Sequence, residues 1–141
     1  MDSELGRLLG ALAARGELDD TLIAVTADHG ESLGEHAERT HSYTLYDAVL
    51  AVPLLFRGPG VPAGRVVEGV VRTVDIAPTL AALLGLAPSR ESDGVDLSPL
   101  WTGSRTAADG PADGIAFAET LATRLEHGWS PLFAIRTRDH H

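Results

Sequence analysis

The stretch Thr21-Leu-Ile-Ala-Val-Thr-Ala-Asp-His-Gly-Glu31 decides the fold. Residues 21–27 form a short, β-rich apolar run without polar alternation, which is typical of a strand buried on both faces, as in a parallel sheet. The polar residues Asp28 and His29 follow at once. In open α/β sheets, ligands gather beyond the carboxyl ends of the strands, so this point is the first place to expect a site.

Helical and strand-like segments alternate around this stretch. Residues 3–15 predict an amphipathic helix that ends at Gly16, because their leucines recur at the spacing of one helical face. A second apolar run at 53–56 predicts another strand, and residues 65–74 predict one or two more. Asp75 is expected to cap a further helix. The leucines of the first helix are Leu5, Leu8, Leu9 and Leu12.

The last part of the chain reads differently. Residues 87–114 are rich in Pro, Gly, Ser and Asp and predict a long irregular connection. Two strand candidates follow it, at 115–119 and 132–137. The alternation of helices and buried strands indicates an α/β fold, and the last two strands predict a separate small sheet.

Composition excludes several classes of function. The 141 residues suit one domain and carry a formal net charge of −9, so neither nucleic acid nor an anionic membrane surface is expected as a partner. The chain has no cysteine, which excludes disulfides, thiolate zinc sites and cysteine nucleophiles. No apolar run reaches the ~18 residues of a membrane span, and the N-terminus lacks a signal-peptide pattern. The sequence assigns no compartment.

The polar residues after the first strand are chemically suggestive. A carboxylate and an imidazole, such as Asp28 and His29, suit a divalent cation, and Gly30 would give the backbone freedom to bend both toward one point. The same residues also fit an ordinary turn with a solvated histidine. His36 and His41 follow closely, and a histidine can donate a proton near neutral pH. A polar loop side chain is the alternative for each, and it is preferred for His36.

Residues 21–36, Thr-Leu-Ile-Ala-Val-Thr-Ala-Asp-His-Gly-Glu-Ser-Leu-Gly-Glu-His, closely resemble the second metal-binding motif of the sulfatases, which belong to the alkaline phosphatase superfamily. The order and spacing of further matching pieces make the resemblance specific from about residue 4 to residue 138. Those pieces are Leu45-Tyr46-Asp47, Val52-Pro53-Leu54-Leu55, Arg57-Gly58-Pro59-Gly60, Val74-Asp75-Ile76-Ala77-Pro78-Thr79-Leu80, Asp93-Gly94-Val95-Asp96-Leu97 and Gly128-Trp129-Ser130-Pro131.

The resemblance implies a role for particular residues. Asp28 and His29 match the family's paired metal ligands, which implies a divalent metal ion, with calcium preferred over manganese, magnesium or zinc. His41 matches a position where relatives carry Lys or His, which contacts the charged group of the ester or assists the leaving group. Such a cation suits the negative charge that builds on the departing oxygen. Glu31, Tyr46 and Asp47 match family positions that are interpreted as structural. They would hold the loop after the first strand and a short helical segment around residues 46–50.

The resemblance also implies an architecture. It predicts part of an alkaline-phosphatase-like sandwich with a mainly parallel sheet, plus the start of a small C-terminal sheet. Residues 1–110 would be the C-terminal half of the catalytic domain, and residues 111–141 a truncated small subdomain.

The chain departs from the family pattern in what it lacks. Relatives have an upstream Asp pair and a nucleophile in a Cys-x-Pro-Ser-Arg-like motif, and neither is present here. Leu86-Ala87-Pro88-Ser89-Arg90 mimics that motif, but Leu86 stands at the nucleophile position, so the segment is interpreted as a loop. The terminal pair His140-His141 is interpreted as a fraying tail. These departures predict a C-terminal fragment whose N-terminal half is a missing partner.

Three functional hypotheses remain. The first is metal-dependent hydrolysis of a small-molecule or saccharide sulfate ester by the full-length parent, with this chain alone inactive. The second is a phosphodiesterase or phosphonate monoester hydrolase of the same superfamily, whose site would look the same from this half. The third is a non-catalytic remnant that keeps the fold without the chemistry.

Overall fold

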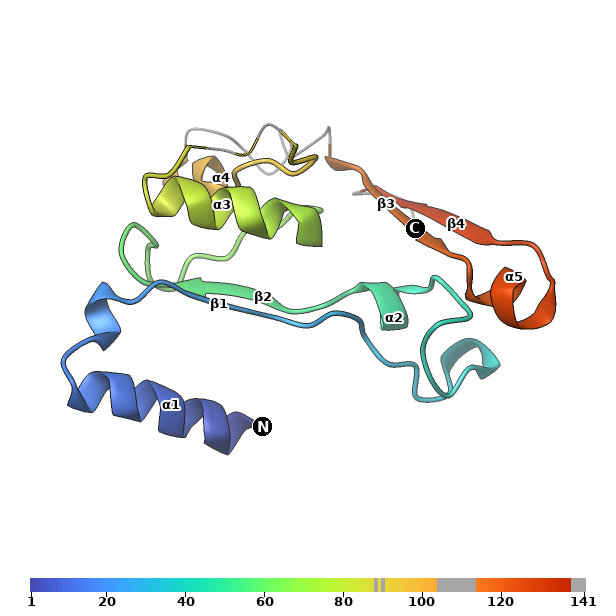
Figure 1. The fold of residues 1–141 in the computed structure, drawn as a ribbon, viewed down its shortest axis with the longest axis horizontal. Helices are drawn as coiled ribbons and strands as arrows, with labels where there is room; N and C mark the ends of the chain where they lie inside the picture. Colours follow the sequence, from blue (N-terminus) through green and yellow to red (C-terminus); the bar gives the residue numbers. More distant parts are fainter. Residues whose placement is uncertain (88, 90, 104–113, 138–141) are drawn as a thin grey trace.

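The computed structural model describes residues 1–87, 89, 91–103 and 114–137. Helix α1 (Asp2–Ala14) confirms the predicted N-terminal helix, and Gly16 ends it with a φ of 71°. A 3₁₀ turn, η1 (Leu18–Asp20), leads into strand β1 (Ile23–Thr26). Strand β2 (Leu54–Arg57) confirms the second strand. Figure 1 shows β1 and β2 as a ribbon between α1 on one side and α3 (Ile76–Leu83) on the other.

The two central strands are antiparallel. Ile23 pairs with Arg57 and Thr26 with Leu54, and no further strand joins them among the described residues. The expected mainly parallel sheet is therefore not confirmed within this chain. An apolar run indicates burial on both faces but says nothing about strand direction. Here the chain leaves β1, passes through the loop and α2 (Asp47–Leu50), and returns alongside it.

The strands predicted at 65–74 are wrong. These residues are irregular up to a 3₁₀ turn, η3 (Thr73–Asp75), which runs directly into α3. Asp75 stands at the N-cap position of α3, as predicted, but its side chain makes no capping hydrogen bond and is fully buried. It accepts hydrogen bonds from the Arg72 guanidinium (2.7 Å) and from the backbone N–H of Val95 (3.0 Å). The hydrogen bonds from the guanidinium to Asp75, together with the attraction of the two charges, raise the pKa of Arg72.

A buried hydroxyl extends this connection. Thr79 donates to the carbonyl of Asp75 (2.6 Å) and accepts from the backbone N–H of Leu97 (2.9 Å). Gly94 lies so close to η3 that a Cβ there would be 2.0 Å from the carbonyl oxygen of Val74. The segment 93–97 is thus fastened to the start of α3. It leads into a short helix, α4 (Ser98–Thr102), inside the stretch expected to be irregular.

The C-terminal part forms its own sheet. Strands β3 (Ala116–Thr120) and β4 (Leu132–Arg136) pair antiparallel, as the two strand candidates predicted, and α5 (Ala122–His127) connects them. Figure 1 places this unit at the opposite end of the molecule from η1. The predicted division between residues 110 and 111 lies outside the described residues, as do Pro88, Arg90, His140 and His141.

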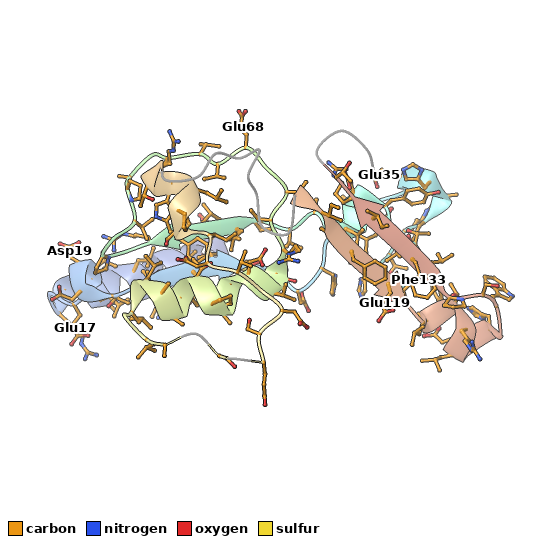
Figure 2. All side chains as sticks on the ribbon, turned by 90° about the horizontal axis from the view of Figure 1, so that it is seen from above. Glu17, Asp19, Glu35, Glu68, Glu119 and Phe133 are labelled. Atoms are coloured by element: carbon orange, nitrogen blue, oxygen red, sulfur yellow. The ribbon has the colours of Figure 1, made fainter. Side chains whose placement is uncertain are left out.

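Little of the apolar surface is covered within the chain. Among the described residues, the buried hydrophobic side chains are Val49, Leu97 and Leu100, and no residue of α1 is buried. On the C-terminal sheet, Phe117 and Phe133 are each 60% exposed. Acidic side chains lie at both ends, with Glu17 and Asp19 at one end and Glu35 and Glu119 at the other (Figure 2). None of the described helices is long and apolar enough to cross a membrane.

Candidate functional site

The segment that follows β1 is fastened to α2. The backbone N–H of Gly30 donates to the carbonyl of Val49 at 2.7 Å. A Cβ at residue 30 would lie 2.2 Å from the carbonyl oxygen of Ala48. Glycine is needed here because two backbones approach closely, which differs from the freedom to bend that the sequence suggests. The close approach holds Asp28 and His29 at the end of the strand.

Two of the three nearby histidines meet at this point. The imidazole of His41 stacks on that of His29, with ring centroids 3.8 Å apart and planes 25° from parallel. His36 lies apart from this pair and stacks instead on Tyr46, with centroids 3.6 Å apart. The side chains of His29 and His41 are 42% and 38% exposed. The paired rings therefore remain open to a ligand.

The hydrogen bonds of His29 determine which ring nitrogen can bind an ion. Its Nδ1 lies 2.8 Å from the carbonyl oxygen of Gly30. A carbonyl only accepts, so Nδ1 carries the hydrogen and Nε2 of the neutral ring keeps its lone pair. Nε2 lies 3.6 Å from Oδ2 of Asp28, whose side chain is 89% exposed. Asp28 is oriented by the backbone N–H of His29, which donates to Oδ1 at 3.1 Å.

His41 is oriented by a carboxylate. Its Nδ1 lies 3.1 Å from Oε2 of Glu31. An ionised carboxylate only accepts, so this contact places a hydrogen on Nδ1 and turns Nε2 away from Glu31. Glu31, interpreted from the sequence as a structural residue, thus contacts the candidate catalytic side chain directly.

The loop between the two histidines folds back through buried polar contacts. Ser32 is 2% exposed, and its hydroxyl contacts the carbonyls of Glu35 (3.0 Å) and Glu38 (3.1 Å). The Glu38 carboxylate accepts from the backbone N–H of Tyr43 at 3.2 Å and from the Thr44 hydroxyl. Backbone N–H groups, its own and that of Leu33, hold the pKa of the Glu35 carboxyl below its usual value. Together these contacts return the chain so that His41 reaches His29.

The C-terminal unit braces the same loop. Thr120 of β3 donates to the carbonyl of Ser42 (2.8 Å), and the Tyr43 hydroxyl donates to Glu126 of α5 (2.5 Å). The hydrogen bond to Glu126 raises the pKa of Tyr43. Arg136 of β4 pairs with Asp47 at the start of α2 (2.6 Å). Sequence reasoning missed these partners, since residues more than seventy positions apart give no local signal.

The site provides two donors for a metal ion rather than a complete shell. Within residues 1–87, 89, 91–103 and 114–137, no group of three or more His, Asp or Glu side chains could hold an ion. Asp28 and His29 nevertheless offer a carboxylate oxygen and an unblocked imidazole nitrogen. Ligand distances of about 2.0–2.6 Å allow one ion to bridge donors that are 3.6 Å apart. The donor set therefore suits a divalent cation with further ligands from elsewhere.

Comparisons with known proteins bear on the family of the chain. The family model described as Sulfatase matches residues 1–86. N-acetylglucosamine-6-O-sulfatase from Bacteroides thetaiotaomicron is 33% identical over 99% of this chain and 25% of its own length. Arylsulfatase K from Homo sapiens is 37% identical over 70% of this chain and 18% of its own length. The chain thus spans a quarter or less of the length of these two relatives.

A solved structure shows the same fold. The phosphonate monoester hydrolase from Silicibacter pomeroyi superposes with a TM-score of 0.79 and 33% identity, covering 96% of this chain and 28% of that one. The family match extends through β1, the paired histidines, α2, β2 and α3. The chain belongs to the sulfatase family of the alkaline phosphatase superfamily.

Proposed function

We propose that this chain carries one half of a sulfuric ester hydrolase site. In this proposal Asp28 and His29 are ligands of a divalent metal ion, and His41 contacts the oxygen that leaves the ester. One observation carries the proposal. The ring of His41 stacks on that of His29, and each ring is oriented by a hydrogen bond at its Nδ1, so that this bond does not use its Nε2. The neutral ring of His29 can thus bind a metal through Nε2, and the imidazolium form of His41 can donate a hydrogen from Nε2.

The donor types bear on the choice of metal. The family resemblance favours calcium, which prefers six to eight oxygen ligands. An imidazole nitrogen from His29 suits zinc better than calcium. The bound ion would polarise the ester oxygens and so stabilise the charge of the transition state. The remaining ligands are not assigned to residues of this chain.

The residues of this chain act mainly on the leaving group. When the sulfur–oxygen bond breaks, the electron pair stays on the departing oxygen, which needs a proton to leave as an alcohol. In its imidazolium form His41 can supply that proton or a hydrogen bond from Nε2, and Glu31 keeps the ring oriented through Nδ1. The attacking group is not assigned to this chain, which has no cysteine and no nucleophile motif.

The substrate class follows from the relatives. A saccharide sulfate is favoured, because N-acetylglucosamine-6-O-sulfatase aligns with 99% of the chain. A further solved structure, 32% identical with a TM-score of 0.79, is described as a complex with its substrate D-glucosamine-2-N,6-O-disulfate. A phosphonate monoester is the second candidate, since the hydrolase from Silicibacter pomeroyi superposes equally well.

Paramagnetic broadening tests the metal half of the proposal. Substoichiometric Mn²⁺ added to the ¹⁵N-labelled chain should broaden the resonances of Asp28, His29 and His41 before others. Asp28→Ala and His29→Ala should abolish that selectivity. The matched control Asp19→Ala, whose side chain is 95% exposed, should leave it intact. Broadening spread evenly over the acidic surface would refute a defined metal site.

A chimaera tests the reaction. The chain would be joined to the upstream part of N-acetylglucosamine-6-O-sulfatase and assayed with glucosamine 6-sulfate and with a phenylphosphonate monoester. His41→Ala should lower kcat for the preferred ester by roughly 10²–10⁴-fold. Preference for the phosphonate would select the second candidate. A soluble, folded chimaera that hydrolyses neither ester would support a non-catalytic remnant.

A further inference from the structure

Three aromatic side chains, Tyr43, His127 and Trp129, form a row that begins two residues after His41 in the chain. The rings of Tyr43 and His127 are stacked with centroids 5.4 Å apart, and those of His127 and Trp129 are 4.8 Å apart at 36°. The first ring comes from the loop that carries His41, and the other two come from α5 and the turn after it. The row therefore joins the candidate site to the C-terminal unit.

The outer end of the row is a large exposed ring on a fixed backbone. Trp129 is 64% exposed. Its backbone N–H donates to the carbonyl of Thr123 (3.2 Å), and the buried Thr123 hydroxyl donates to the carbonyl of Ser130 (2.7 Å). The αL conformation of Gly128 ends α5 just before it. A rigidly presented, exposed indole is a typical feature of a binding surface.

Backbone strain lies between the row and the site. Ser42, which separates His41 from Tyr43, has a φ of 101°, an unfavourable conformation for a residue with a side chain. The Thr120 hydroxyl of β3 donates a hydrogen bond to the carbonyl of Ser42 at 2.8 Å. Two residues span at most about 7 Å, so the Cα atoms of His41 and Tyr43 lie within that distance of each other. The hydrogen bond from β3 thus helps to hold Ser42 in this strained conformation, which supports a functional requirement for the positions of its two neighbours.

We propose that the outer face of Trp129 seats the pyranose ring of a sulfated sugar as a specificity-determining residue, with His127 and Tyr43 supporting the indole from its other side. This inference rests on the proposed function, in which the sulfate end lies at His29 and His41. The C–H face of a pyranose is weakly positive and apolar, and it complements the negative face of an aromatic ring. The sulfate then fixes one end of the ligand and the aromatic row recognises the attached ring.

The test uses the ¹⁵N-labelled 141-residue chain and three probes: N-acetylglucosamine 6-sulfate, N-acetylglucosamine and sodium sulfate. Trp101 and Trp129 are the two tryptophans, so Trp101 serves as an internal reference for the indole N–H signals. The sugar sulfate should shift the Trp129 indole and the imidazoles of His29 and His41, and leave Trp101 in place. Sodium sulfate should shift only the imidazoles.

Variants separate recognition of the ring from binding of the anion. Trp129→Ala should weaken binding of the sugar sulfate by roughly fivefold or more, and leave the response to sodium sulfate unchanged. Trp129→Phe should retain most of the affinity. Leu125→Ala, at a side chain of α5 that is 80% exposed, is the matched control and should bind as the parent chain does.

The outcomes distinguish this inference from the function on which it rests. If the sugar sulfate shifts the imidazoles while Trp129 stays unchanged and Trp129→Ala binds normally, the aromatic seat is refuted and the proposed site stands. If no probe shifts the imidazoles, the proposed site fails and the seat fails with it. If the Trp129 signal changes with protein concentration instead of ligand, a second copy of the chain covers it, which also overturns the inference.

Discussion

The imidazole of His41 lies face to face with that of His29 at a centroid distance of 3.8 Å. Each ring is oriented through its Nδ1, that of His29 by the Gly30 carbonyl and that of His41 by the Glu31 carboxylate. The two rings thus form one stacked pair, and neither of these two hydrogen bonds uses an Nε2 atom. This arrangement lets one imidazole serve as a ligand while its neighbour contacts the substrate.

Glu31 is predicted to maintain the stack. Glu31→Ala removes the acceptor for His41 Nδ1 and should weaken or abolish the ring-to-ring nuclear Overhauser effects between His41 and His29. Glu31→Gln retains an acceptor oxygen and should preserve them. Because Glu31 is 47% exposed, the free energy of unfolding should change by less than about 1 kcal/mol in both variants. Equal loss of the contacts in both variants would contradict a positioning role.

Gly30→Ala should disturb the site through the backbone. The new Cβ would lie 2.2 Å from the Ala48 carbonyl oxygen, so α2 or the site segment must move. We expect a loss of about 1–3 kcal/mol in the free energy of unfolding, measured by urea titration. The control is Gly10→Ala in α1, where nothing lies within 4 Å of the new Cβ. That change should stabilise the helix by about 0.5–1 kcal/mol, and comparable losses in both variants would contradict the explanation.

Asp75 is expected to be the most sensitive carboxylate for stability. Its side chain is fully buried against Arg72, whose own side chain is 19% exposed. Asp75→Ala leaves that guanidinium and the Val95 N–H without their acceptor, and should cost about 3–5 kcal/mol in unfolding free energy. The exposed Asp20→Ala should change stability by about 0.5 kcal/mol or less. A small effect at Asp75 would indicate that solvent readily replaces the carboxylate.

The sequence predicted what depends on local patterning and missed what depends on distant partners. The leucine spacing of α1 and the apolar runs of β1 and β2 were enough to predict those elements, because periodicity records which side chains share one face of an element. Strand direction was not predictable, since an antiparallel partner such as β2 buries the same apolar residues. Residues 65–74 illustrate the same limit: their valines resemble a strand, yet none of the described strands pairs with them.

The candidate site shows a similar division. Asp28, His29 and His41 could be named because their chemical types and the family motif point to them. The stack of His41 on His29, the contact of Glu31 with His41 and the bracing of the loop by Thr120 and Glu126 could not. These contacts arise from the return path of the loop and the packing of the C-terminal unit, which no short motif encodes. The roles of the three named residues remain predictions.

The hydrogen bond between Tyr43 and Glu126 should give the C-terminal unit a pH-dependent attachment. The contact raises the pKa of Tyr43 above its usual value of about 10. A raised pKa means that the contact contributes stability below about pH 10, which is lost as pH rises through the folded-state value. In a Tyr46→Phe background, absorbance at 295 nm reports Tyr43 alone, since the chain has two tyrosines. Adding Glu126→Gln should lower the midpoint, and an unchanged midpoint would contradict the contact.

The last prediction concerns metal affinity and turnover by the 141-residue chain alone. Asp28 and His29 supply at most three ligand atoms, whereas calcium takes about six to eight and magnesium needs a nearly octahedral shell. Calorimetry with calcium, manganese or zinc should therefore give dissociation constants on the order of a millimolar or weaker, with Asp28→Ala removing the residual site-specific heat.

With no assigned nucleophile and an incomplete metal shell, two contributions that would each lower the barrier by several kcal/mol are absent. Hydrolysis of p-nitrophenyl sulfate and bis-p-nitrophenyl phosphate should then stay at background. Tight binding or turnover that Asp28→Ala abolishes would show that the chain holds ligands and a nucleophile beyond those assigned here, and would overturn the half-site model.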